Sequence, residues 1–260
     1  YIFISNKIKD IFLKFLIKKL LKFAYKNINL KVIVQNQDDK NYFLKSNIFN
    51  KKRIEIIRGS GIDLSHYKPL PEPKSKHVTI SYTGRMLKDK GVHWLIEAFI
   101  SAKKELRSLK LILAGPLDKN NPTAFTEEEF RNILRNKNIQ YCGNVKDIRQ
   151  VLKKTNISVL LSKREGLPLG LMEAAAVGRS IIATDVTGCR EVAINNYNAI
   201  TVPLGDIKKI KNAILKLSKN KKLRKKFSDN GKALVKSDME KNKVFSRYYE
   251  IYQKLMKDDL

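Results

Sequence analysis

The sequence has little of the material from which disulfides and metal sites are built. It contains two cysteines, Cys142 and Cys189, and three scattered histidines in 260 residues. The cysteines have no C-x-x-C spacing and no histidine cluster nearby, so neither a zinc site nor a disulfide framework is expected. Buried, reduced thiols in a cytoplasmic protein are the default interpretation.

Long apolar runs and a recognisable leader are also missing. The first 30 residues are apolar but are interrupted by Lys7, Lys9, Lys14, Lys18, Lys19, Lys22 and Lys26. No small-residue cleavage site follows them, and no stretch reaches the roughly 18–20 uninterrupted apolar residues of a membrane span. The periodicity of residues 8–26 fits a basic amphipathic helix that seeks a membrane surface. It also fits an ordinary helix of a larger domain, which we prefer.

Acidic side chains are scarce. The chain has 53 Lys and Arg against 25 Asp and Glu, a formal net charge of +28. Such a surface favours a polyanionic partner, or it is simply a lysine-rich solvated surface; both interpretations stay open. The sequence has no nucleic-acid-binding module and no aromatic cluster among its basic runs, so a nucleic-acid partner is not expected.

From residue 78 onward the chain alternates between short apolar strands and amphipathic helices. Strands are predicted at 78–82, 109–114, 139–142, 157–161, 180–184 and 199–202, and helices at 91–104, 126–135, 148–153 and 169–177. This alternation predicts an α/β fold, a Rossmann-like parallel sheet with helices on both faces. Ligands of such sheets bind beyond the carboxyl ends of the strands.

The flanking segments are simpler. Short strands are predicted at 31–35 and 54–57, followed by a Pro-containing linker at 68–76. Two helices are expected to close the chain, with apolar stripes at 207–217 and 245–256 on either side of the basic run 219–226. We expect domain boundaries near residues 70 and 240: a helical and strand remnant at 1–70, a ligand-binding domain at 71–240 and a crossover helix at 241–260.

The strongest chemical signal is REGLPLGLME at 164–173, where seven residues separate Glu165 from Glu173. A helix is predicted to open after Pro168, so its first free N–H groups form an anion site at the end of the strand 157–161. Two carboxylates beside such a site suit hydrogen bonds from sugar hydroxyls. The simpler alternative is a capped amphipathic helix with a glutamate on its solvent face.

A second signal is GRMLKDKG at 84–91, between a predicted strand and a predicted helix. Gly84 permits a tight turn, and Arg85 and Lys90 are suited to converge on a diphosphate. The alternative is an ordinary basic loop. A third signal, GSGID at 59–63, indicates a loop that lines a cleft or a plain turn. A Walker loop and G-x-G-x-x-G are both absent, which disfavours P-loop NTPases and dinucleotide oxidoreductases.

Together these motifs resemble family-4 retaining glycosyltransferases of the GT-B fold, from about residue 28 to the end. The matching segments are VIVQNQDD (32–39), GSGIDLSHYKP (59–69), YTGRMLKDKGVHWLIEAF (82–99), LILAGP (111–116) and REGLPLGLMEAAAVGRSIIATDVTGCREV (164–192). Within that family they are most similar to capsule and O-antigen enzymes. Those enzymes transfer a sugar from a UDP-sugar to a polyprenyl-diphosphate-linked acceptor.

The resemblance implies roles for matching residues. Gly84, Arg85 and Lys90 would bind the donor diphosphate, and Glu165 would contact the donor sugar and help hold the developing oxocarbenium ion as the catalytic residue. Glu173 would bind the ribose. The remaining implied donor-binding positions are the backbone of Gly166, Leu167 and Pro168 at the sugar and phosphate, and Asn144 and Val145 near the base. The resemblance implies no metal and no cofactor, because basic side chains and the helix dipole stabilise the leaving diphosphate.

The chain also departs from the family pattern. Arg58 stands where the family usually has Pro, Ser180 where it has Pro, and Ala199 where it has Gly. By this resemblance, most of the N-terminal acceptor domain is expected to be missing, and the isolated chain is therefore expected to lack turnover. A separately encoded N-terminal half and a peripheral contact with the inner face of the cytoplasmic membrane are its expected partners. A non-catalytic nucleotide-sugar binder is the alternative function.

Overall fold

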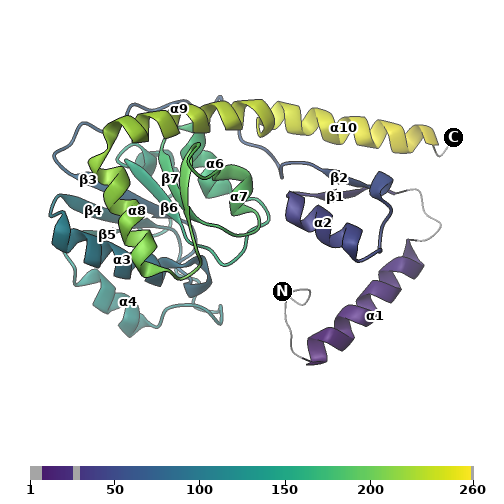
Figure 1. The fold of residues 1–260 in the computed structure, drawn as a ribbon, viewed down its shortest axis with the longest axis horizontal. Helices are drawn as coiled ribbons and strands as arrows, with labels where there is room; N and C mark the ends of the chain where they lie inside the picture. Colours follow the sequence, from purple (N-terminus) through teal and green to yellow (C-terminus); the bar gives the residue numbers. More distant parts are fainter. Residues whose placement is uncertain (1–7, 26–29, 259–260) are drawn as a thin grey trace.

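The computed structural model describes residues 8–25 and 30–258 (Figure 1). The helices are α1 (Ile8–Ala24), α2 (Gln37–Lys45), α3 (Val92–Glu105), α4 (Glu127–Leu134), α5 (Arg149–Leu152), α6 (Leu169–Ala176), α7 (Cys189–Val192), α8 (Ile207–Lys219), α9 (Lys221–Asp238) and α10 (Lys241–Asp258), with 3-10 turns η1 (Lys51–Arg53) and η2 (Lys88–Lys90). The strands are β1 (Val32–Val34), β2 (Ile54–Ile56), β3 (Val78–Thr83), β4 (Leu109–Ala114), β5 (Ile139–Tyr141), β6 (Ile157–Leu160), β7 (Ser180–Thr184) and β8 (Ala199–Val202).

Six of the strands form one parallel sheet in the order β5-β4-β3-β6-β7-β8. The chain runs outward from β3 through β4 to β5, then returns to the other side of β3 and continues through β6, β7 and β8. The strand order therefore reverses between β3 and β6. In open parallel sheets this reversal leaves a crevice beyond the carboxyl ends of the two strands, where ligands bind.

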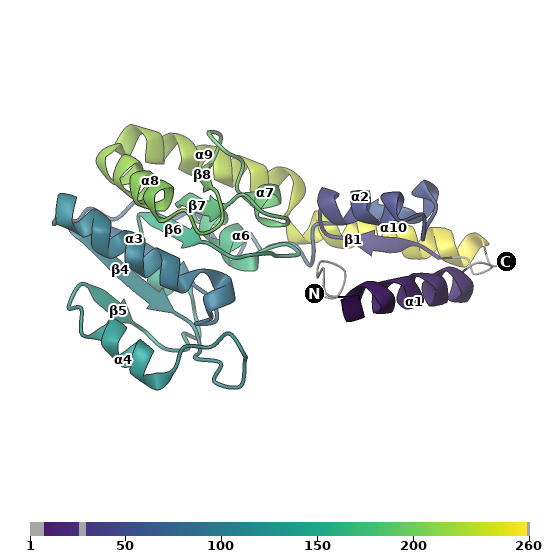
Figure 2. The same cartoon turned by 60° about the horizontal axis from the view of Figure 1, so that its bottom comes forward.

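Helices cover both faces of the sheet, which confirms the predicted α/β fold. α3 and α8 pack together on one face, and α6 and α9 pack on the other (Figure 2). β6 and β7 are buried along their whole length, as expected for strands covered on both sides. The predicted apolar face of α3 is buried as well, through Val92, Leu95, Ile96 and Phe99.

The Pro-containing segment 68–76 runs along the amino ends of the strands and is fixed there. The guanidinium of Arg179, which is 1% exposed, donates to the carbonyl oxygens of Leu70 at 3.2 Å and Pro71 at 3.0 Å. Glu72 pairs with Arg224 at 2.5 Å. The connection between the two parts of the chain is therefore held in place by buried charge-assisted hydrogen bonds.

The N-terminal part forms a small lobe in which β1 and β2 pair in parallel, Val32 opposite Ile54. α2 follows β1 and packs on both strands. α2 was not predicted, because none of its residues is buried and it therefore has no apolar stripe. Its start does carry a local signal: Asn36 accepts a hydrogen bond from the backbone N–H of Asp39 at 2.8 Å, a standard N-cap.

α10 crosses from the sheet to the small lobe and packs against β1 and the end of β2 (Figure 1). The predicted apolar stripe divides between two sides of this helix. The inward side packs with Ile33 and Ile57 through Val244, Tyr248, Ile251 and Leu255. The outward side is exposed and consists of Phe245, Tyr249, Tyr252 and Met256.

Three long helices, rather than the expected two, lie between residue 207 and the described end of the chain. The basic run 219–226 contains the start of α9, where the Asn220 side chain caps the backbone N–H of Leu223 at 2.8 Å. Lysines cover the solvent side of α9, and its narrow buried stripe includes Phe227, Gly231 and Val235. Because the stripe contains a glycine and is surrounded by lysines, the apolar periodicity of this segment did not predict a helix. The predicted helix at 8–26 is α1, and residue 26 lies outside the described residues.

Candidate functional site

A cavity of about 460 Å³ lies at the carboxyl ends of β3 and β6, where the strand order reverses. Five of the predicted site residues line it together: Gly84, Arg85, Lys90, Glu165 and Pro168. They come from the loop after β3 and the loop after β6, which meet because parallel strands end at one edge of a sheet. The ends of β3 and β6 and the start of α6 form the rest of the wall.

The first turn of α6 faces this cavity with Leu169 and Gly170. Pro168 is the N-cap and has no side-chain capping bond, and its carbonyl oxygen accepts from the N–H of Leu171 at 3.1 Å. The N–H groups at the start of a helix have no intrahelical acceptor and carry the positive end of the helix dipole. The turn sits close to β3, since a Cβ on Gly170 would lie 3.0 Å from Thr83 Oγ1.

The two predicted basic side chains have different partners. Lys90 Nζ lies 2.6 Å from Glu165 Oε1, and both side chains are largely buried. Arg85 pairs with Asp118 at 3.0 Å and stays half exposed at the mouth of the cavity. The buried pair keeps the Glu165 carboxylate compensated, and Lys90 has two further N–H donors for an anion. Asp118 was not predicted, because it follows β4 rather than lying in a recognised motif.

Gly84 and Gly115 allow the loops after β3 and β4 to touch. A Cβ on Gly115 would lie 1.9 Å from the Gly84 carbonyl oxygen, so only glycine fits at residue 115. The N–H of Gly115 donates to the Gly143 carbonyl at 2.7 Å, which connects these loops to the loop after β5. The hydroxyl of the buried Tyr82 donates to the Arg85 carbonyl at 2.6 Å and fixes the turn that carries Arg85.

The loop that carries Glu165 is held by the loop after β7. The N–H of Glu165 donates to the Thr187 carbonyl at 3.1 Å. Gly188 permits this contact, because a Cβ there would lie 2.3 Å from the Glu165 carbonyl oxygen. Cys189 is buried beside this loop, and burial raises the pKa of its thiol to about 12, so it is an inert packing residue.

Glu173 does not line the cavity. Its carboxylate accepts a hydrogen bond of 2.5 Å from the Tyr67 hydroxyl, and burial raises the pKa of Glu173 above the usual glutamate value. The charges of Asp147 and Arg149, beyond β5, also act on Tyr67. Glu173 therefore belongs to a second polar group, between α6 and the loop after β5. Tyr67 was not predicted as a site residue, because it lies 106 residues away from Glu173 in the chain.

Asn144 and Val145 follow β5 on the same edge of the sheet but do not line the cavity. Asn144 is exposed, and Val145 packs against Ile112, Ala114 and Val151. They precede Asp147 and Arg149, whose charges act on Tyr67 of the second polar group.

Gly166 and Leu167 face the small lobe rather than the cavity. The Gly166 carbonyl accepts a hydrogen bond from Asn36 Nδ2 at 2.9 Å. Leu167 lies 3.4 Å from the position of a Cβ on Gly59. The GSGID segment itself makes a close crossing: a Cβ on Gly61 would lie 2.8 Å from the Cα of Lys241.

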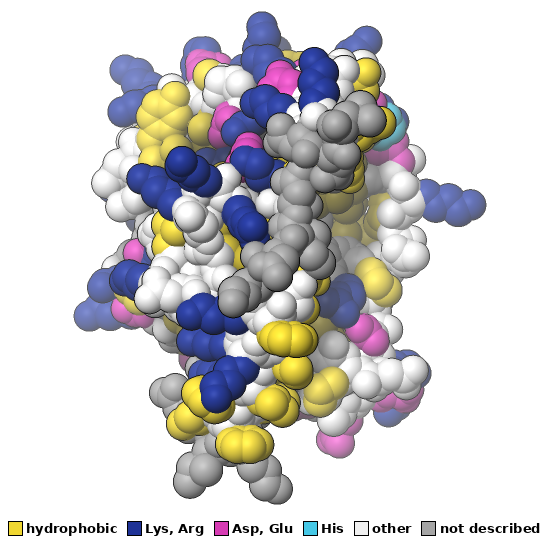
Figure 3. Space-filling view, turned by 90° about the vertical axis from the view of Figure 1, so that its right-hand side faces the viewer, with side chains coloured by type: hydrophobic (Ala, Val, Ile, Leu, Met, Phe, Trp, Pro, Cys, Tyr) yellow, Lys and Arg dark blue, Asp and Glu magenta, His cyan; other side chains and the backbone are white. Residues whose placement is uncertain are grey.

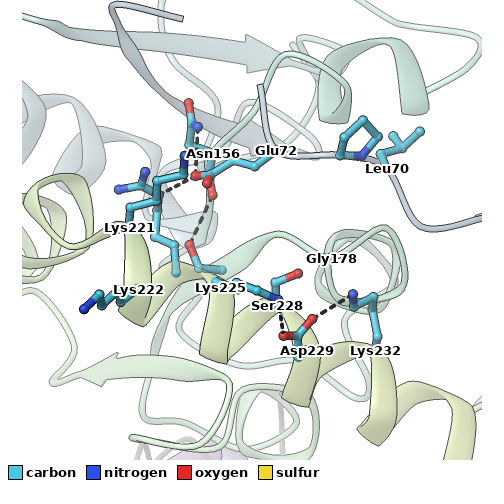
Figure 4. Close-up of a pocket in the computed structure, with 13 residues that line it drawn as sticks. Leu70, Glu72, Asn156, Gly178, Lys221, Lys222, Lys225, Ser228, Asp229 and Lys232 are labelled. Carbon is cyan, nitrogen blue, oxygen red and sulfur yellow. Dashed lines mark hydrogen bonds and ion pairs between the residues drawn. The ribbon is translucent and has the colours of Figure 1, made fainter. Parts of the chain in front are cut away.

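A second cavity, of about 440 Å³, lies at the opposite, amino edge of the sheet (Figure 4). Lys221, Lys222 and Lys225 line it, but Lys225 and Lys232 both pair with Asp229, and Arg224 pairs with Glu72. Lys221 and Lys222 take no part in these pairs, so the lining of this cavity keeps a net positive charge. Among the residues that the structure describes, no group of three or more His, Cys, Asp or Glu side chains is arranged to hold a metal ion.

The cavity at β3 and β6 therefore combines a helix N-terminus, a half-exposed arginine, a lysine and a carboxylate. The first three are suited to bind phosphate oxygens, and the carboxylate is suited to accept hydrogen bonds from hydroxyl groups. This is the composition expected for a ligand that joins a phosphate to a sugar.

Comparison with known proteins finds relatives among glycosyltransferases. The chain is 26% identical over 258 residues to the capsular polysaccharide biosynthesis glycosyltransferase CapM of Staphylococcus aureus, covering 95% of this chain and 66% of that protein. It is 25% identical over 268 residues to the N,N'-diacetylbacillosaminyl-diphospho-undecaprenol alpha-1,3-N-acetylgalactosaminyltransferase of Campylobacter jejuni, covering 98% of this chain and 68% of that protein. The chain thus spans about two thirds of the length of these relatives.

Solved structures share the fold. A glycosyltransferase from Rickettsia africae superposes with a TM-score of 0.79 at 21% identity, covering 91% of this chain and 67% of that one. Anabaena HepE in complex with UDP superposes with a TM-score of 0.79 at 17% identity, covering 91% and 68%. The six-stranded domain is thus the Rossmann-like domain of a GT-B fold.

The family model for glycosyl transferases group 1 matches residues 67–234, which include the six-stranded sheet and every side chain that lines the β3 and β6 cavity. The chain therefore belongs to the glycosyl transferases group 1 family.

Proposed function

We propose that the cavity at β3 and β6 binds the diphosphate and sugar of a UDP-sugar donor. The observation that carries the proposal is the meeting of Arg85, Lys90 and the first turn of α6 around the Glu165 carboxylate. UDP is the proposed nucleotide because it is bound to the similarly folded HepE. The basic groups and the helix dipole would stabilise the departing diphosphate without a metal ion.

The two glutamates would hold different parts of the donor. Glu165 would accept hydrogen bonds from the sugar hydroxyls and stabilise positive charge at the anomeric carbon as the nucleotide leaves, in a family-4 reaction that retains configuration. Glu173, with Tyr67, would hold the ribose, and the loop at Asn144 and Val145 would contact the base. The backbone at Gly166, Leu167 and Pro168 would border the sugar and phosphate.

The proposed acceptor is a polyprenyl-diphosphate-linked or other glycan, in capsule or lipopolysaccharide synthesis. Two relatives support this proposal: the name of one refers to capsular polysaccharide biosynthesis, and the name of the other refers to a sugar linked to undecaprenyl diphosphate. A lipid-linked acceptor places the site near a membrane, and we propose peripheral contact with its cytoplasmic face. No helix within residues 8–25 and 30–258 is long and apolar enough to span a membrane. A separate polypeptide that completes the acceptor side is the second proposed partner.

Calorimetric titration of UDP in the presence of EDTA tests the donor site. Binding is expected, and Arg85→Ala should weaken it by about 1.5–3 kcal/mol, as for the loss of a charge-assisted hydrogen bond. Lys88→Ala is the matched control, because Lys88 lies in the same loop but pairs with Glu129. Absence of heat and of a thermal shift at millimolar UDP would refute the proposal. Sugar transfer to a lipid-linked acceptor would then separate an enzyme from a non-catalytic nucleotide-sugar binder.

A further inference from the structure

The first turn of α2, in the small lobe, contacts the residues on both sides of Glu165. The residue before Glu165, Arg164, forms an ion pair with Asp39. The residue after it, Gly166, accepts a hydrogen bond of 2.9 Å from Asn36 Nδ2. Asn36 is fully buried although it is polar, so the loss of this bond would leave one of its two amide hydrogens without an acceptor.

The same turn also holds the second loop that supports Glu165. Asp38 Oδ2 accepts from Thr187 Oγ1 at 2.9 Å and lies 2.8 Å from Arg190 Nη1. Thr187 is the residue whose carbonyl accepts the Glu165 N–H at 3.1 Å. Both loops around Glu165 are therefore tied to three polar residues of one helical turn, Asn36, Asp38 and Asp39.

The turn is itself rigid. Asn36 Oδ1 accepts the Asp39 N–H at 2.8 Å, and Asn36 Nδ2 donates to Asp39 Oδ2 at 2.8 Å. The fit against Gly166 is close, since a Cβ there would lie 2.6 Å from Gln35 Oε1. A different contact also joins the lobes: Arg58 pairs with Glu191 and with Asp238. Attachment of the small lobe therefore does not depend on Asp39 alone.

We propose that Asn36 and Asp39 are positioning residues for Glu165, so that the small lobe determines how the donor sugar is held. The inference rests on the proposed function for the identity of the ligand. The position of the 163–168 loop, however, can be measured without any ligand. On this account Asp39 acts on the sugar part of the donor and not on the nucleotide part, which lies toward Glu173.

Three variants test the proposal. Asp39→Ala removes the ion pair to Arg164 together with the hydrogen bond from Asn36 Nδ2, and the exchanged pair Asp39→Arg with Arg164→Asp restores the ion pair with opposite polarity. Glu105→Gln is the control, because it removes the ion pair with Lys211 between α3 and α8, far from Glu165. Asp39 is chosen over the buried Asn36, whose replacement threatens folding.

Two measurements are made on each variant. Amide hydrogen exchange reports how well residues 163–168 are held. Calorimetry compares the affinity for UDP with that for one UDP-sugar. This UDP-sugar is the one whose affinity for the unaltered protein differs most from that of UDP, chosen from UDP-glucose, UDP-galactose, UDP-N-acetylglucosamine and UDP-N-acetylgalactosamine. Asp39→Ala should speed amide hydrogen exchange in residues 163–168 about tenfold. It should also reduce the ratio between the affinities for the UDP-sugar and for UDP about tenfold, while the affinity for UDP itself stays within about twofold of the unaltered protein. The exchanged pair should restore both values, and Glu105→Gln should change neither.

Equal behaviour of Asp39→Ala and Glu105→Gln in both measurements would overturn the inference. So would an equal loss of UDP and UDP-sugar affinity, which would indicate a general structural role. Failure of the unaltered chain to bind UDP would refute the proposed function instead, and hydrogen exchange would then decide the positioning claim alone.

Discussion

Glu165 and Glu173 have different partners, and this difference predicts separable effects. Glu165 lies in the β3 and β6 cavity beside Lys90, whereas Glu173 is bonded to Tyr67 outside it. Glu173→Gln should mainly weaken UDP binding, since it alters the proposed ribose contact. Glu165→Gln should leave UDP affinity nearly unchanged and abolish discrimination among UDP-sugars. Calorimetry with UDP and UDP-sugars measures both effects, and equal losses of UDP affinity would show that these roles are misassigned.

The raised pKa of Glu173 predicts a pH dependence of stability. Burial is its main cause, opposed by the Tyr67 hydrogen bond. The folded protein then binds the Glu173 proton more tightly than the unfolded chain does. The stability contributed by this proton is present below the ordinary glutamate pKa of about 4.3 and is lost as pH rises through the higher folded-state pKa.

Glu173→Gln removes this titration and keeps an oxygen that accepts from Tyr67. The free energy of unfolding of the variant, minus that of the unaltered protein, should therefore increase as pH rises through this window. Denaturant unfolding measured at a series of pH values tests this. A difference that is constant or that falls with pH would contradict the assignment of a buried carboxyl to Glu173.

At the scale of elements, the ends of the parallel strands position the site, and glycine makes their approach possible. Gly115 and Gly143 both have positive φ, +139° and +65°, so alanine is strained at either position. Only at Gly115 would the new Cβ collide, with the Gly84 carbonyl; at Gly143 it meets nothing within 4 Å. Gly115→Ala should therefore destabilise the protein by about 1–3 kcal/mol more than Gly143→Ala. Denaturant unfolding of the two variants measures this difference in stability. Equal losses of stability in both variants would show that the Cβ at residue 115 does not collide with the Gly84 carbonyl.

The elements that were predicted from sequence are those whose apolar residues repeat. β3 to β8 and α3 have this repeat, and α4 begins in addition with a capping box of Thr126 and Glu129. α2 was not predicted because it contacts the rest of the protein mainly through polar groups and therefore has no apolar stripe. α9 was not predicted because its many lysines obscure its apolar stripe. Local motifs likewise indicated Arg85, Lys90 and Glu165, which line the β3 and β6 cavity. Tyr67, Asp118 and Asn36 could not be identified, because their partners are distant in sequence and become neighbours only in the folded chain.

At the scale of the whole molecule, charge and exposed apolar surface occur together around the small lobe. α1 exposes Phe12 by 70% and Phe23 by 84%, and Figure 3 shows hydrophobic side chains among Lys and Arg on this side of the molecule. This combination is typical of surfaces that bind anionic membranes. We predict that the protein floats with vesicles containing phosphatidylglycerol and not with phosphatidylcholine vesicles.

Replacement of both Phe12 and Phe23 by Ser should reduce this flotation. Ile100→Ser is the control, because Ile100 is an exposed apolar residue of α3, on the sheet domain. Equal flotation with neutral and anionic vesicles, or equal loss with the control, would argue against a membrane contact through α1.

The position of bound UDP tests the central claim most directly, because the molecule has two cavities of similar size at opposite edges of its sheet. A crystal structure of the chain grown with UDP and EDTA would locate it. We predict the diphosphate at the first turn of α6, within hydrogen-bond distance of Arg85 or Lys90, and the ribose beside Glu173. UDP bound instead in the amino-edge cavity, among Lys221, Lys222 and Asn156, would contradict the account.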